Sequence, residues 1–200
     1  MNRKAILRAP VFVAIVSILS GCASYTVKPM PTMNPTTAAN HTEKDNLYIA
    51  ARVLSTAHEC RAVFSDNLVG GGYIPVEVSF ENMGQSPIIL YRQNITLISR
   101  KNGRISPVSP TEVAEHFSNS IVGGALVTGV FGIAAAEHAN HKRESAFHSK
   151  GLRKTTVIAN GNVVDGFLYF KGKVDQTLPS HISISFNPHG KTERVDLPVK

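Results

Sequence analysis

The sequence predicts a mainly β protein, an antiparallel β-sandwich interrupted by one helical insertion. Three observations in the 200 residues support this fold class. Apolar and polar residues alternate with a period of two in several short segments, which is typical of half-buried strands. Turn-forming Gly, Pro and Asn residues separate these segments at short intervals. A central stretch, residues 110–150, lacks the alternation and favours helix instead.

The N-terminal 21 residues have the three parts of a secretory signal peptide. Basic residues come first, and residues 11–19 then form an apolar run that only Ser17 interrupts. This run is shorter than the roughly 20 apolar residues that a membrane-spanning helix needs. A single membrane-spanning anchor is the alternative interpretation, and the length of the run argues against it.

The run Leu19-Ser20-Gly21-Cys22 ends this signal. It resembles the lipobox of bacterial lipoprotein precursors, in which small residues let a peptidase reach the bond before a cysteine. The resemblance implies a diacylglyceryl group on the Cys22 sulfur, cleavage before Cys22, and acylation of the new amino group. Two or more acyl chains hold a protein stably on a membrane. Because Ala23 rather than Asp follows the cysteine, the resemblance favours the outer membrane and a domain that faces the periplasm.

The composition of the remaining chain limits its partners. Removal of residues 1–21 leaves 18 Lys and Arg residues against 14 Asp and Glu residues, a net charge of +4. This mild excess is not the dense basic patch of a nucleic-acid-binding protein, so we expect no nucleic-acid partner. With Cys22 acylated, Cys60 has no intrachain disulfide partner. An odd cysteine in an oxidising compartment is either buried or available to pair with another protein. Free cysteines are among the most buried residues, so we expect Cys60 to be buried.

Residues 22–45 predict a flexible, lipidated tether, because three prolines stand among Thr, Asn and Ala with few side chains to bury. The folded domain is then expected at residues 46–200, a normal size for one domain.

Strands are predicted in order along the first half of this domain. Residues 47–54 and 60–64 are expected to form a first pair, and three glycines at 70–72 mark a turn. Residues 74–81 show the clearest alternation, which predicts one buried face and one solvated face. Two more strands, at 88–91 and 94–99, and a hairpin turn at 101–104 follow.

The last quarter of the chain predicts further strands. Asn160-Gly161-Asn162 is a hairpin signal between two of them. The predicted strands lie at 155–158, 163–170, 182–186 and 195–199, and a turn at 188–191 precedes the last one.

Residues 75–84 resemble a recurring piece of immunoglobulin-like bacterial envelope domains, in which a strand ends in an Asn and a Gly-containing turn. The apolar pattern of residues 95–98 and the strand-like run 161–170 resemble the strands that follow in such domains. The resemblance implies an immunoglobulin-like antiparallel β-sandwich with a glycine-rich helical insertion. It implies a binding or scaffold role and carries over no catalytic residue.

The insertion begins at Pro110, with Thr111 as a candidate N-cap. Its apolar part, residues 121–136, includes Ala125, Gly129 and Gly132, whose small side chains let another helix approach closely. Three interpretations stay open: a helix or helical hairpin packed on the sandwich, a helix that binds itself or a partner protein, and a segment that dips into the membrane beside the anchor.

Two further hypotheses concern chemistry. His138, His141 and His148 lie near acidic residues and are weak candidates for a Zn²⁺ or Cu²⁺ site, although the stretch matches no metal signature and a solvated helix face is the simpler interpretation. His58 and Cys60 would point the same way on a strand, so a Cys–His nucleophile is conceivable, but no third catalytic group accompanies them.

We therefore predict a lipid-anchored, non-enzymatic protein of the cell envelope, without a cofactor, that binds protein partners as an accessory or assembly factor. A periplasmic ligand-binding or metal-binding lipoprotein that uses the histidine region is the alternative, and a small hydrolase is the third hypothesis.

Overall fold

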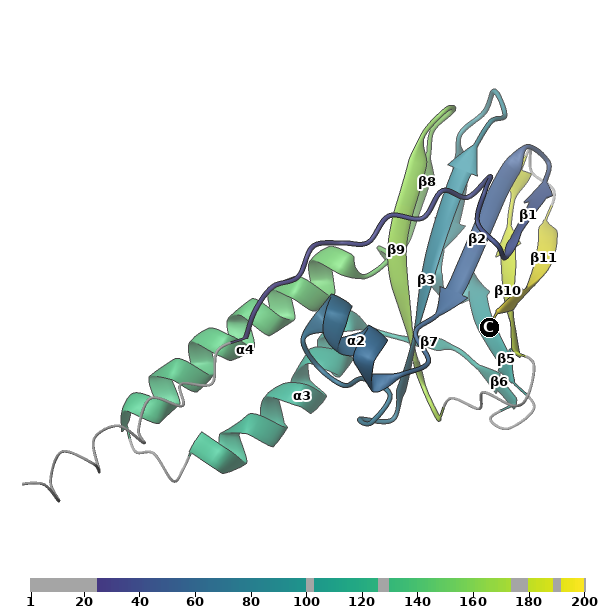
Figure 1. The fold of residues 1–200 in the computed structure, drawn as a ribbon. Helices are drawn as coiled ribbons and strands as arrows, with labels where there is room; N and C mark the ends of the chain where they lie inside the picture. Colours follow the sequence, from purple (N-terminus) through teal and green to yellow (C-terminus); the bar gives the residue numbers. More distant parts are fainter. Residues whose placement is uncertain (1–24, 100–102, 126–129, 174–179, 189–191, 200) are drawn as a thin grey trace, which may run out of the picture.

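The computed structural model describes residues 25–99, 103–125, 130–173, 180–188 and 192–199, with side chains outside residues 119–135. In this part of the chain the protein is mainly β, with several antiparallel sheets and three α-helices (Figure 1). The strands are β1 (His41–Lys44), β2 (Leu47–Val53), β3 (Tyr73–Asn82), β4 (Ile88–Tyr91), β5 (Ile95–Ser99), β6 (Gly103–Ile105), β7 (Pro107–Val108), β8 (Thr155–Ile158), β9 (Val163–Lys171), β10 (Ser180–Phe186) and β11 (Glu193–Val199). The α-helices are α2 (Ala57–Phe64), α3 (Pro110–Ala125) and α4 (Val130–Lys150), and a 3₁₀ turn, η1 (Arg92–Asn94), joins β4 to β5.

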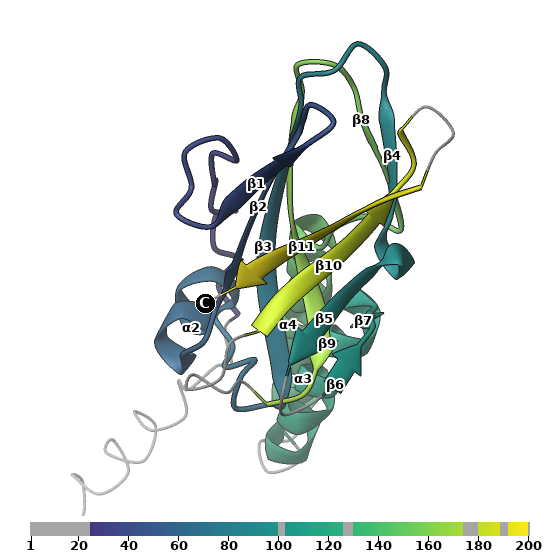
Figure 2. The same ribbon diagram turned by 90° about the vertical axis from the view of Figure 1, so that its right-hand side faces the viewer.

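Three sheets form an open, sandwich-like arrangement (Figure 2). The largest has the strand order β1-β2-β3-β9-β7, the second has the order β11-β10-β5-β6, and β4 pairs with β8 in a two-stranded ribbon. The pairs within these sheets are antiparallel. The prediction of a mainly β fold with antiparallel sheets is confirmed.

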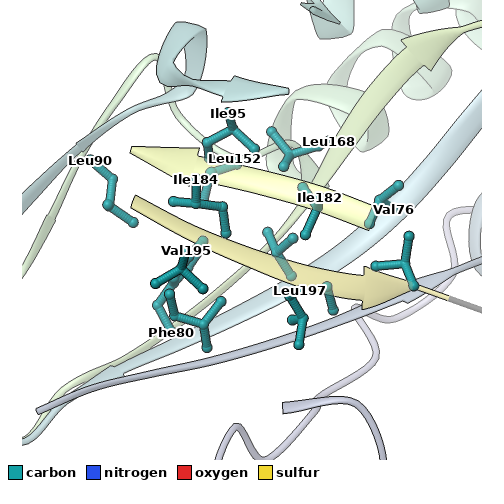
Figure 3. Close-up of a cluster of buried hydrophobic side chains, with 14 of the residues drawn as sticks. Val76, Phe80, Leu90, Ile95, Leu152, Leu168, Ile182, Ile184, Val195 and Leu197 are labelled. Atoms are coloured by element: carbon teal, nitrogen blue, oxygen red, sulfur yellow. The ribbon is translucent and has the colours of Figure 1, made fainter. Parts of the chain in front are cut away.

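One apolar core fills the space between the sheets. The even-numbered side chains of β3, such as Val76 and Phe80, face Ile182 and Ile184 of β10 across this space (Figure 3). Burial of such side chains contributes about 1.5–3 kcal/mol each, so this core is the main source of stability for the sandwich.

The second face of β3 is buried as well, which corrects the prediction of a solvated face. Tyr73 and, on β9, Phe167 and Tyr169 pack on this side against Phe64 of α2 and Phe147 of α4. The rings of Phe64 and Phe167 are 4.8 Å apart, and the phenol of Tyr169 donates to the Phe147 carbonyl oxygen at 3.2 Å. The strand is therefore sandwiched between the apolar core and the helices.

Helix α2 occupies the place where residues 60–64 were predicted to form a strand, and that prediction is wrong. The Thr56 side chain accepts from the Glu59 amide, and the Glu59 carboxylate accepts from the Thr56 amide, so a capping box starts the helix. Ser65 ends it with a φ of 63°. The spacing of Thr56 and Glu59 was the signal in the sequence that favoured helix.

The hairpin predicted at residues 160–162 is also wrong, although a turn is present. Gly161 has a φ of 70°, and the Asn162 amide donates to Ala159. However, β8 pairs with β4 and β9 pairs with β3, so the two strands belong to different sheets. The β5–β6 pair confirms the hairpin predicted at residues 101–104, and β10 and β11 pair across the turn predicted at 188–191; both turns lie partly outside the described residues.

The segment predicted to be a free tether is folded onto the domain from Tyr25 onward. It runs from α4 across the largest sheet to β1, which pairs with β2 (Figure 1). Pro35 is buried on the way, and the Ala51 amide donates to the Asn40 carbonyl oxygen at 3.3 Å. Apolar contacts and strand pairing with the domain offset the loss of chain entropy.

The helical insertion is present as α3 and α4, which pack against each other and project from the sheets (Figure 1). The hydroxyl of Ser109, rather than that of the predicted cap Thr111, accepts from the Glu112 amide at 3.1 Å. Pro110 takes the first helical position, where a missing N–H costs nothing. After α4, the Leu152 amide donates to Phe167 at 2.8 Å and brings the chain back to β9.

Candidate functional site

The site that the structure offers is the place where the chain enters the domain. We call it the N-terminal seam, formed by residues 25–30, α4 and the end of α2. Tyr25 is only 8 % exposed and forms a buried cluster with Ala139 and Ala146. Met30, further along the segment, packs against the cluster of α2 and α4 side chains on the outer face of the largest sheet.

Arg143 is the centre of the seam. Its Nε donates to Asp66 Oδ2 at 2.8 Å, and another guanidinium nitrogen donates to the Asn140 side chain at 2.9 Å. The guanidinium carbon also lies 4.9 Å from the ring centre of Tyr25, which is cation–π geometry. The Arg143 side chain is 4 % exposed and Asp66 is 15 % exposed, so this is a nearly buried ion pair.

Burial raises the pKa of the Tyr25 phenol above its usual range, the carboxylate of Asp66 raises it further, and Arg143 lowers it. The phenol is therefore neutral at physiological pH. Its hydroxyl is buried and has no hydrogen-bond partner among the described residues.

Two main-chain contacts extend the seam. The Ser65 hydroxyl donates to the Thr26 carbonyl oxygen at 2.6 Å, and the Lys150 ammonium donates to the Lys28 carbonyl oxygen. Lys150 is 4 % exposed, and burial lowers its pKa. The C-cap residue of α2 and the last residue of α4 thus hold the same short piece of main chain.

The predicted lipidation site, Cys22, lies outside the described residues, as does Gly129. Ala125 is the last residue of α3 and Gly132 lies in the first turn of α4, so the backbone of both is helical. The structure therefore brings Ala125 and Gly132 to the same end of the helical pair. Among the described residues, no helix is long and apolar enough to cross a membrane.

The three histidines of the metal hypothesis, His138, His141 and His148, lie on the exposed face of α4. His148 Nε2 is 3.0 Å from the Thr111 hydroxyl of α3. Within the part of the chain that the structure describes, no three His, Cys, Asp or Glu side chains gather closely enough to hold a metal ion.

Cys60 is fully buried, as expected, and its Sγ lies 3.9 Å from the Leu54 carbonyl oxygen. Burial raises the pKa of this thiol, and hydrogen bonds from Val69 and Leu68 lower it. The effect of burial is larger, so the pKa lies above its usual value. His58 is exposed on the same helix, where residues two apart point in different directions. The strand geometry that would have paired the two side chains is absent.

A shallow polar pocket of about 420 Å³ lies at the other end of the sandwich, lined by the loops before β2, between β3 and β4, and after β10. Asn82 forms its buried floor, and its side-chain amide donates to Ser86 and Ile158 carbonyl oxygens at 2.9 Å each. These bonds satisfy Asn82 within the fold, so the residue supports the loops.

The seam residues Tyr25, Asp66 and Arg143 were not predicted from the sequence. Their contacts join positions 77 and 118 residues apart, and no local motif marks them. One signal was available: Ala139, Arg143, Ala146 and Lys150 follow each other at helical spacing on one face of α4.

No family model matches the chain, and no curated protein matches its sequence. Solved structures with a similar shape include ycdA of Bacillus subtilis, described as a "putative lipoprotein", at 14% identity and a TM-score of 0.42, covering 80% of this chain and 39% of that one. The yjhA protein of Bacillus subtilis has 13% identity and a TM-score of 0.40, covering 81% and 96%. A functionally unknown protein of Listeria monocytogenes has 12% identity and a TM-score of 0.40, covering 88% and 89%. The chain thus spans about 39% of the length of ycdA. Similarities this low establish neither a family nor a function.

Proposed function

We propose that the protein is a lipid-anchored component of the bacterial cell envelope, acylated at Cys22 and facing the periplasm. The observation that carries the proposal is the run Leu19-Ser20-Gly21-Cys22 directly after an apolar segment too short to span a bilayer. The part of the domain that the structure describes begins at Tyr25, three residues after the cysteine, so cleavage before Cys22 would leave this part whole. Ala23 next to the cysteine supports the outer membrane as the location.

We further propose that the domain is an immunoglobulin-like sandwich with a non-enzymatic role, an accessory or assembly factor that binds an envelope protein. Support comes from the two main sheets that share one core. The burial of Cys60 gives no support to the competing idea of a cysteine nucleophile, because a buried thiol with a raised pKa is a poor nucleophile.

The β4–β8 ribbon offers a surface for such a partner. Ile89 and Val157 are direct cross-strand neighbours and are 42% and 59% exposed, and Tyr91 on the same strand is 44% exposed. Clustered apolar side chains on a two-stranded ribbon are typical of a protein-binding surface.

Metabolic labelling with a radioactive or clickable palmitate analogue tests the anchor. We expect label in the wild-type protein, with the protein in the membrane fraction, and no label in the Cys22→Ala variant. A wild-type protein that reaches the periplasm without label would contradict the proposal. The Cys60→Ala variant is the matched control and should be labelled like the wild type.

Site-specific photo-crosslinking tests the partner surface. A photoreactive residue at position 157 is expected to give a discrete crosslinked envelope protein, and Ile89→Asp should abolish that product without a change in melting temperature. Val163→Asp, at an apolar position that is 48% exposed on another strand, serves as the control. Equal crosslinking in both Asp variants would argue against this surface.

A further inference from the structure

Strand β8 has β4 as its only strand partner among the described residues. In an antiparallel pair of strands, residue pairs that exchange main-chain hydrogen bonds alternate with pairs that do not. Arg92 and Lys154 form the next pair in the register of this ribbon, just before Thr155 of β8. The Arg92 amide donates to the Lys154 carbonyl oxygen at 3.0 Å, so this is a bonded pair. The main-chain N–H and C=O groups of Thr155, one position further on, therefore face away from β4.

The same alternation places the main chain of Val157 on the outer edge of β8. No backbone hydrogen bond joins Thr155 or Val157 to a described residue outside the ribbon. Proteins usually protect such an edge with a charged residue, a proline or a bulge within the strand. The four residues of β8, Thr-Thr-Val-Ile, include neither a charge nor a proline. An extended segment of another chain can pair with the outer edge of such a strand as an additional strand.

The exposed side chains of the ribbon would meet alternate side chains of this added strand. Val157 and its cross-strand neighbour Ile89 form a pair without main-chain hydrogen bonds, in which the Cα atoms are about 4.5 Å apart. The two residues are 59% and 42% exposed. An added strand would lie about 4.8 Å from β8, so its side chain on this face would contact Val157 directly. An apolar residue at that position of the partner is therefore favoured.

Positive charge gathers at one end of β8. Arg153 and Lys154 come directly before the strand and are exposed, and Arg92 comes directly after β4 beside them. None of the three makes an ion pair with a described residue. The stretches that supply the two strands, residues 82–111 and 145–164, contain no Asp or Glu. Carboxylates on a partner would complement this charge.

We infer that β8 binds an extended, acidic segment of a partner protein as an additional strand. An apolar side chain of the segment lies against Val157, and its carboxylates lie beside Arg153 and Lys154. The inference rests on the proposed function, because it concerns the partner of the ribbon surface described there, and it adds how that partner binds and which charge it carries. Pairing of β8 with β8 of a second copy of this chain would supply no carboxylate.

Photo-crosslinking at position 157, in cells that make the acylated full-length protein, tests the added strand. Thr155→Pro removes an N–H that faces away from β4, and proline is tolerated on an edge strand at such a position. We expect the yield of the crosslinked product to fall roughly fivefold or more, the effect of one lost main-chain hydrogen bond. Thr155→Val keeps the N–H and a β-branched side chain, so this matched control should give the wild-type yield.

Reversal of the charge at the end of β8 tests the acidic character of the partner. Arg153→Glu combined with Lys154→Glu should lower the yield of the product, because like charges at an interface repel. Lys142→Glu, on the exposed face of α4, is the control and should leave the yield unchanged. Mass spectrometry of the wild-type product should place the crosslink in a partner segment with Asp or Glu residues next to it. The melting temperature of each variant shows whether its fold is kept.

The results that would overturn the inference differ from the result that would overturn the proposed surface. A wild-type yield in Thr155→Pro, or an equal loss in Thr155→Val, would contradict strand addition. A yield that the charge reversal does not change, or a crosslink to a second copy of this chain, would contradict an acidic partner. If Thr155→Pro melts at a lower temperature, the charge reversal decides, because it changes exposed side chains only. Absence of any product at position 157 in the wild type would overturn the partner surface itself.

Discussion

Arg143 makes side-chain contacts with three other residues of the N-terminal seam. Its guanidinium contacts a carboxylate, an amide and an aromatic ring while only 4 % of its side chain is exposed. A charge this deeply buried is stable only with its partners in place. The residue joins three parts of the chain that are distant in sequence.

Replacement of Arg143 by Met is expected to lower the free energy of unfolding by about 3 kcal/mol, because Asp66 is left partly buried without its partner. Chemical denaturation measures the change. Lys142→Met, at the adjacent exposed position, is the control and should stay within about 0.5 kcal/mol of the wild type. Similar losses in the two variants would show that the ion pair is not the cause.

Replacement of Ser79 is expected to change the free energy of unfolding in the opposite direction, toward higher stability. Its side chain is fully buried on β3, and its hydroxyl has no hydrogen-bond partner among the described residues. We expect Ser79→Ala to raise the free energy of unfolding by about 1 kcal/mol, since an unpaired buried hydroxyl is costly. Ser183, a buried serine that is hydrogen-bonded to Asp196, should lose stability on the same replacement. A loss at both positions would mean that Ser79 has a partner in solution.

The elements differ in how far the sequence could predict them. Strands such as β3 and β10 show their alternation locally, and both were predicted close to their observed bounds. Helix α2 was mistaken for a strand because its apolar residues, Cys60, Val63 and Phe64, are too few to show a clear period. The pairing of β8 with β4 joins residues about 70 positions apart in the sequence, and no local turn pattern can reveal such a pairing.

The capping box of α2 gives a prediction for this element. Thr56→Ala should lower the free energy of unfolding by about 1 kcal/mol, because the Glu59 amide loses its acceptor. Replacement of Thr36, whose hydroxyl contacts Asn34 in an exposed turn, is the control and should have little effect. Thermal or chemical unfolding followed by circular dichroism reports both variants.

Glu59 makes the same element sensitive to acid. Partial burial raises its pKa, but hydrogen bonds from Thr56 and Ser55 outweigh this, and the pKa lies below its usual value of 4.5. The stabilising contribution is therefore present above the unfolded-state pKa and is lost as the pH falls through the folded-state pKa. We expect Glu59→Gln to lose less stability than the wild type between about pH 6 and about pH 3. A parallel loss in both proteins would contradict this.

At the scale of the whole molecule, one continuous path joins the start of the described chain to the sandwich. The chain packs on α4 at Tyr25, crosses the largest sheet and enters it as β1. The sequence predicted the anchor and the sandwich from local patterns. It could not predict the docked segment, because Pro, Thr and Asn residues are also typical of free linkers and the contacts are long-range.

The helical pair was predicted in outline, from the loss of alternation after Pro110 and from the apolar stretch that follows. The candidate site was not predicted, because the ion pair of Arg143 and Asp66 depends on tertiary packing. Cys22 and the glycine-rich stretch stay predictions from sequence patterns. The structure shows α3 and α4 packed against each other, with Val113 and Phe147 in the cluster on the largest sheet. Binding of a partner protein or of the membrane by residues 121–136 stays a prediction.

The intact mass of the mature protein, extracted from membranes with detergent, tests the account most directly. We predict a single polypeptide of residues 22–200 that carries a diacylglyceryl group and an additional acyl chain on Cys22. A membrane-extracted protein that still begins at Met1, or that begins at residue 22 without lipid, would contradict the account.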